Sequence, residues 1–107
     1  MATDNSYNIS VTSINNSSYH LTGSDGTGEI SGNNITVFIP VDDTINFIVD
    51  VSGHPFYIKD ISSSGTDNQV SDVSNQGATN GTISWTPTIA GTYFYDCSNH
   101  DLMSGTI

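Results

Sequence analysis

Short segments in which apolar and polar residues alternate recur along the chain, with turn-forming residues between them. In residues 7–14, Tyr7, Ile9 and Val11 alternate with polar residues, as in a strand with one buried face. Residues 45–51 are apolar and rich in β-branched side chains, which is typical of a buried strand. No segment shows the 3.6-residue apolar period of a helix. This pattern predicts an all-β fold.

Further strands are expected at 19–22, 35–39, 56–58, 82–86, 92–95 and 105–107, with a weaker candidate at 70–73. The glycine-rich residues 23–28 are expected to form a loop or tight turn. Ser, Thr, Asn and Asp are abundant, and Ser, Asn and Asp compete with a helical backbone for hydrogen bonds. About seven or eight short strands predict a β-sandwich, formed by residues 1–107 as a single domain.

The charge of the chain is strongly one-sided. Its formal net charge is −10, and Lys59 is the only Lys or Arg. Such a surface cannot neutralise phosphates, so nucleic-acid binding is excluded and anionic membranes are disfavoured. Two interpretations stay open: the charge steers the protein to a partner with a basic face, or it keeps a monomeric domain soluble.

Cys97 is the only cysteine, so no disulfide can form within the chain. It must be a free thiol, an intermolecular bridge or a metal ligand. No apolar run is long enough to cross a bilayer, and the N-terminus lacks the basic and apolar regions of a signal peptide. A periplasmic, thylakoid-lumen or extracellular location is expected if a signal was removed, and an intracellular one or excision from a longer chain stays open.

The segment from Cys97 to Met103 carries the clearest chemical signal. Its spacing is Cys-x-x-His-x-x-Met, with His100 in the middle, and a second histidine, His54, lies upstream in Gly53-His54-Pro55. A thiolate, two imidazoles and a weak thioether form the ligand set that suits copper in both Cu(I) and Cu(II) states. Taken singly, a lone Cys, His or Met is more simply a packing residue, but their combination and order point to one site.

These residues and their surroundings resemble the cupredoxins, the small blue copper proteins. The run at 91–95 before Cys97 is similar to the penultimate strand of plastocyanin-like members, and residues 105–107 resemble the start of the last strand. The resemblance covers roughly residues 35–107, and the short loop is more similar to amicyanin than to plastocyanin. It implies a Greek-key, cupredoxin-like sandwich binding one copper ion, with His54, Cys97 and His100 as equatorial ligands and Met103 as the axial ligand.

One residue departs from the family pattern. In the family, the residue after the upstream histidine usually donates its backbone N–H to the cysteine sulfur, but here that residue is Pro55, which has no N–H. Losing that donor should stabilise Cu(II) and lower the reduction potential. The N–H of Asn99 remains as another candidate donor.

The leading functional prediction is one-electron transfer by a mononuclear type 1 copper protein. The alternative is a cupredoxin-like structural or binding module of a larger surface or viral protein, with copper structural or absent. Copper storage or delivery is a third possibility. An enzyme is not expected, because four protein ligands leave no open position on the metal, and no oxyanion hole accompanies Cys97.

Overall fold

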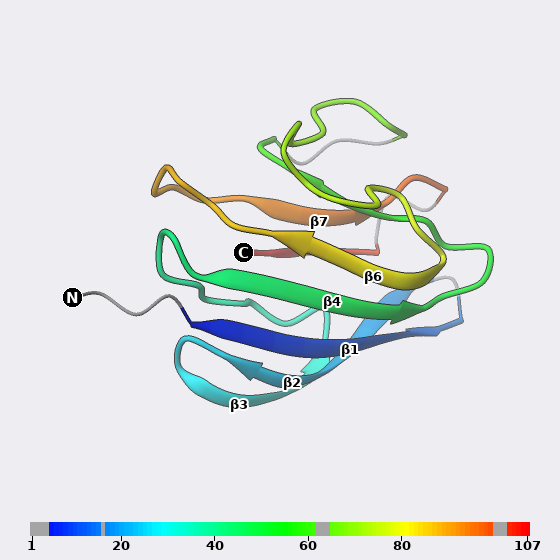
Figure 1. Ribbon diagram of the computed structural model, residues 1–107. Helices are drawn as coiled ribbons and strands as arrows, with labels where there is room; N and C mark the ends of the chain where they lie inside the picture. The colour runs from blue at the N-terminus through cyan, green and yellow to red at the C-terminus, as the bar shows by residue number, and fades with distance from the viewer. Residues whose placement is uncertain (1–4, 16, 62–64, 100–102) are drawn as a thin grey trace.

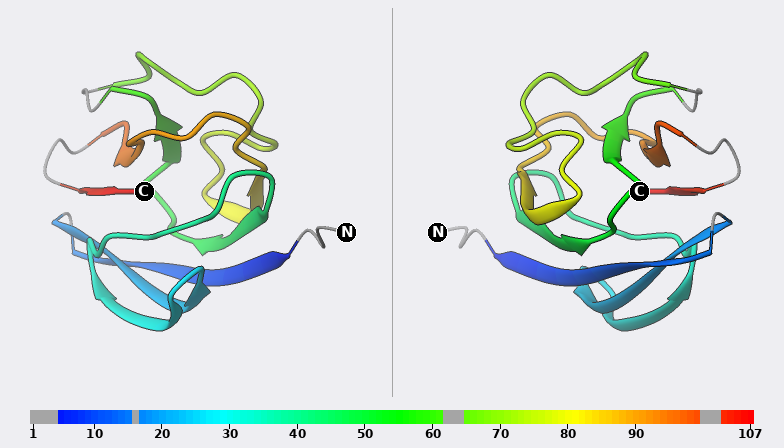
Figure 2. Two further views of the ribbon diagram at one scale, coloured as in Figure 1. Left: turned by 90° about the vertical axis from the view of Figure 1, so that its left-hand side faces the viewer. Right: turned by 90° about the vertical axis from the view of Figure 1, so that its right-hand side faces the viewer.

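The computed structural model describes residues 5–15, 17–61, 65–99 and 103–107. Within these ranges the chain forms strands and turns and no helix, so the predicted all-β class is confirmed. The strands form two sheets, and Figure 2 shows the blue and cyan strands in a lower layer with the orange and red strands above them. The architecture is that of a two-sheet β-sandwich.

The larger sheet has five strands in the order β3-β2-β1-β4-β6 (Figure 1). The strands are β1 (Ser6–Ile14), β2 (Ser18–Asp25), β3 (Gly28–Asn33), β4 (Thr44–Asp50) and β6 (Asn80–Trp85). β1 and β4 run parallel, and all other neighbours in this sheet are antiparallel. The predicted alternation is confirmed, because Ile9 and Val11 of β1 face inward and are buried.

The smaller sheet has three antiparallel strands in the order β5-β7-β8. The strands are β5 (Phe56–Lys59), β7 (Phe94–Cys97) and β8 (Ser104–Thr106). In this register Phe56 lies opposite Cys97. The start of β5, which follows His54, therefore meets the end of β7, which carries Cys97.

The core between the sheets is built around Phe56. Its ring stacks on that of Tyr95 at a centroid distance of 5.3 Å, and it meets Phe47 at 4.9 Å and Tyr19 at 5.0 Å. All four side chains are fully buried. Aromatic groups at these separations contribute packing energy beyond their buried area, so they fix the two sheets against each other.

The expected strand at 35–39 is wrong. Val37 is buried and its N–H bonds to Thr106, but the N–H of Phe38 goes to the carboxylate of Asp25 and its carbonyl to the N–H of Gly26. Because these groups bond to β8 and to the side chain and turn at the end of β2, no continuous ladder forms. The candidate at 70–73 is also wrong, since its residues lie in turns and loop.

The boundaries of the glycine-rich loop also need correction. Only Gly26 and Thr27 form the turn between β2 and β3, which pair as a hairpin. β3 itself was not predicted, because its sequence, Gly-Glu-Ile-Ser-Gly-Asn, has low strand propensity. Backbone hydrogen bonds to β2 hold this segment as a strand despite its low propensity.

The segment 65–79, yellow-green at the top of Figure 1, covers the smaller sheet. The side chain of Gln76 accepts the N–H of Ile58 and donates to its carbonyl, so it bonds to the edge of β5 as a neighbouring strand would. The N–H of Val70 also bonds to the carbonyl of Ile58. The edge of β5 is therefore satisfied rather than open.

Candidate metal centre

His54 lies in the turn between β4 and β5. Gly53, with a φ of 81°, adopts the left-handed conformation that this turn requires. The N–H of His54 then bonds to the carbonyl of Val51 at 2.8 Å. Only 8% of His54 is exposed, so the turn directs the imidazole into the protein.

Cys97 ends β7 and is buried, with 1% exposure. Its N–H bonds to the carbonyl of Met103 at 2.9 Å, which closes the base of the loop between β7 and β8. Met103 is fully buried. His100, the remaining predicted ligand, lies outside the described residues.

The structure brings His54 and Cys97 together, although 43 positions separate them in the sequence. His54 Nδ1 and Cys97 Sγ are 3.7 Å apart. A first-row metal ion bonded to nitrogen at about 2.0 Å and to sulfur at about 2.3 Å, with about 120° between the bonds, separates these atoms by about 3.7 Å. A direct thiol–imidazole hydrogen bond would also fit this distance. The spacing therefore suits a shared soft metal ion without requiring one.

Two side-chain contacts that the sequence did not indicate hold the segment around His54. The Asn99 amide donates to the carbonyl of Gly53 at 3.0 Å. From the opposite sheet, the Tyr19 hydroxyl reaches the carbonyls of His54 at 2.8 Å and Pro55 at 3.0 Å. Asn99 could have been suspected from its place inside the motif, whereas Tyr19 carries no signal beyond an apolar position in a strand.

Burial raises the pKa of the Tyr19 hydroxyl well above its usual range, and the neighbouring Cys97 thiol raises it further. Tyr19 therefore stays neutral and keeps its proton as a donor at physiological pH.

In the described part of the chain, no three His, Cys, Asp or Glu side chains group as a metal site. The predicted ligand set also includes Met103 and His100, and His100 lies outside the described residues. The chain matches no family model, no curated protein and no solved structure. Among the described residues no helix is long and apolar enough to cross a membrane.

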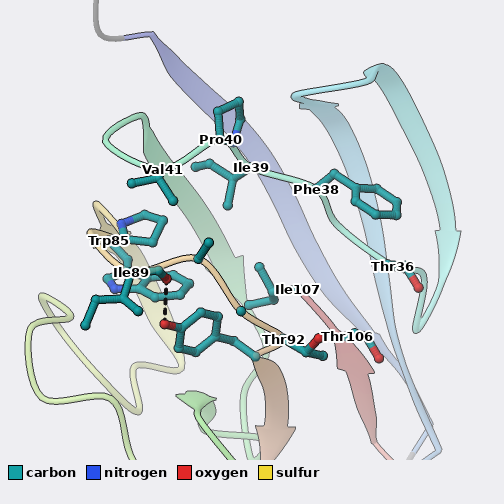
Figure 3. A pocket seen from close by; sticks show the side chains of 14 residues that line it. Thr36, Phe38, Ile39, Pro40, Val41, Trp85, Ile89, Thr92, Thr106 and Ile107 are labelled. Carbon is teal, nitrogen blue, oxygen red and sulfur yellow. Dashed lines mark hydrogen bonds between the residues drawn. The ribbon is translucent and has the colours of Figure 1, made fainter.

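An apolar groove of about 390 Å³ lies at the end of the smaller sheet away from Cys97 (Figure 3). Its walls are mostly apolar, with Ile39 and Val41 on one side and Trp85 and Ile89 on the other. Tyr93 packs edge-on against Trp85 at 4.8 Å and donates its hydroxyl to the carbonyl of Ile89. His54, Cys97 and Met103, the predicted metal ligands that the structure describes, do not line this groove.

Lys59 is fully buried on the side of the smaller sheet that faces away from the core. Its ammonium group lies 3.9 Å from the carboxylate of Asp96 and donates to the carbonyl of Gly65 at 2.8 Å. Because Lys59 is the only Lys or Arg and is buried, no Lys or Arg side chain is exposed on the surface. Exposed acidic side chains remain at Glu29, Asp42, Asp50, Asp60, Asp67 and Asp72.

Proposed function

We propose that this protein is a mononuclear type 1 copper protein of the cupredoxin kind and that it transfers single electrons. The observation that carries the proposal is the 3.7 Å approach of His54 Nδ1 to Cys97 Sγ, made by two buried side chains that are distant in sequence. In this proposal the two-sheet fold has the Greek-key connectivity of a cupredoxin.

The proposed ligands are His54, Cys97, His100 and Met103. Copper bound by such a set would supply a Cu(I)/Cu(II) couple. The protein's contribution is a fixed pair of donors: His54 is held by its turn, and Cys97 by the bond from its N–H to Met103. Rigid donors reduce the rearrangement that accompanies a change of oxidation state, which favours rapid electron transfer over catalysis.

The proposed partner is a redox protein with a basic face, met by a monomer of this protein. Among the described residues six acidic side chains are exposed, and the only Lys is buried. The surface is therefore acidic without basic side chains to offset it, which favours encounter with positive charge and disfavours self-association. Raising the ionic strength should slow association with such a partner.

A titration of the reduced, metal-free protein with Cu(II) tests the copper site. We expect an intense thiolate-to-copper absorption band that saturates at one equivalent, together with a type 1 electron paramagnetic resonance spectrum. Cys97→Ala should abolish the band, and His54→Ala should weaken or change it. His20→Ala is the matched control, because His20 bonds to Asn33 in a different part of the fold and should leave the band unchanged.

The apolar groove supports a second candidate function, that of a binding module. Phe38 and Ile89 at its walls are 57% and 71% exposed, which is unusual for large apolar side chains. A protein that gives no Cys97-dependent band, but loses partner binding on Ile89→Ser, would favour this function. Unchanged partner binding in Ile89→Ser would count against it.

A further inference from the structure

Tyr19 is the residue of the larger sheet that reaches the candidate metal centre. Its backbone is held by Asn34, whose side-chain oxygen accepts the N–H of Tyr19 and whose own N–H bonds to the carbonyl of Tyr19. Its ring packs edge-on against Phe56, the residue at the centre of the core. The hydroxyl therefore emerges at a fixed point on the far side of the core.

At that point the hydroxyl meets two consecutive carbonyls, those of His54 and Pro55. The carbonyl of Pro55 also lies 3.4 Å from the N–H of Ser98, the residue after Cys97. Pro55 has no N–H, so this residue cannot donate to the Cys97 sulfur. The Tyr19 hydroxyl donates to this same turn, which carries His54 and bonds through the Pro55 carbonyl to the residue after Cys97.

From these contacts we infer that Tyr19 is a positioning residue of the metal centre: its hydroxyl fixes the His54–Pro55 turn so that the imidazole faces Cys97. This inference rests on the proposed function. Without the hydroxyl, two buried carbonyls lose a donor, the turn gains freedom and the His54–Cys97 approach is no longer fixed. The thiolate also loses a nearby polar group that moderates its electron donation.

The test compares Tyr19→Phe with Tyr95→Phe. Each variant removes one hydroxyl from a buried ring that contacts Phe56. The Tyr95 hydroxyl donates to the carbonyl of Ile35, away from His54, so Tyr95→Phe is matched in chemistry but not in location. Circular dichroism would establish that both variants fold.

In the copper-loaded protein, Tyr19→Phe should shift the thiolate-to-copper band and the electron paramagnetic resonance parameters and lower the reduction potential. Tyr95→Phe should leave all three at wild-type values. Equal spectra and potentials for Tyr19→Phe and wild type would overturn the inference, as would equal shifts in both variants.

A metal-free measurement separates this inference from the copper proposal. Cys97 is 1% exposed, so alkylation by iodoacetamide reports local opening around the thiol. Loss of the hydroxyl should raise the alkylation rate about tenfold in Tyr19→Phe, and by less than about twofold in Tyr95→Phe. If wild type gives no copper band, the copper proposal fails while this rate still decides the positioning role. Unchanged alkylation in Tyr19→Phe would refute that role.

Discussion

The outward faces of the two sheets differ in what they expose. On the five-stranded sheet, Ser10, Thr12, Thr22 and Thr82 are open to solvent, and their hydroxyls can bond to water. On the three-stranded sheet, Lys59 and Asp96 are buried, and Lys59 donates to the carbonyl of Gly65 in the segment 65–79. Neutral hydroxyls tolerate exposure without partners, whereas a buried ion pair is stable only while both charges and their covering segment are in place. The smaller sheet, which carries Cys97, therefore depends more heavily on its covering segment.

The largest effect is expected from Lys59→Ala on the covered face. The variant leaves the Asp96 carboxylate buried without its cation, which should cost about 3–5 kcal/mol of unfolding free energy in urea denaturation. The double variant Lys59→Met with Asp96→Leu removes both charges and should recover most of this loss. A double variant no more stable than Lys59→Ala would show that packing, rather than the uncompensated charge, causes the loss.

A smaller effect is expected from Gln76→Ala at the edge of the same sheet. The N–H of Ile58 loses its acceptor at 2.7 Å and the segment loses its bond to β5, which should cost about 1–3 kcal/mol. Hydrogen exchange of the Ile58 backbone N–H should also accelerate in this variant. Gln69→Ala is the control, since its side chain is exposed and bonds only locally to Thr66. Protection at Ile58 that survives in Gln76→Ala would contradict the described edge.

The smallest effect is expected from Ile48→Thr on the open face. Ile48 is 42% exposed and lies between Ser10 and Thr82 in the sheet, so a hydroxyl there adds to a surface of the same kind. The unfolding free energy should change by less than about 0.5 kcal/mol. The same substitution at a buried position, Ile58→Thr, should lower the unfolding free energy several times more, by about 2–4 kcal/mol. Comparable losses at the two positions would mean that the outward faces do not differ as described.

Much of the fold could be predicted because it depends on local alternation. The inward positions of β1 and the apolar run of β4 were visible in the sequence, since one-sided burial imposes a two-residue period. β3 was not predictable in this way, because pairing with β2 overrides its low propensity. The strand predicted at 35–39 is wrong for the converse reason. Its residues favour a strand, but the backbone N–H and carbonyl of Phe38 bond to Asp25 and Gly26 instead of to a neighbouring strand.

The candidate site was predictable only in part. The Cys-x-x-His-x-x-Met spacing is local, and it alone predicted that the loop after β7 and Met103 belong to the candidate site. The approach of His54 to Cys97 depends on the register of β5 and β7, which sequence spacing does not specify. Tyr19 lies on another sheet, and its contact with His54 exists only because the two sheets pack face to face. The pairing of Lys59 with Asp96 also requires knowing which side of the smaller sheet is covered.

The burial of Lys59 has a consequence for proteolysis. A protease that cuts only after Lys or Arg has one target bond in this chain, between Lys59 and Asp60, and the Lys59 side chain is inaccessible in the folded protein. Cleavage there requires the segment 65–79 to move away and β5 to leave the sheet, so the rate of cutting measures how often the covered sheet opens.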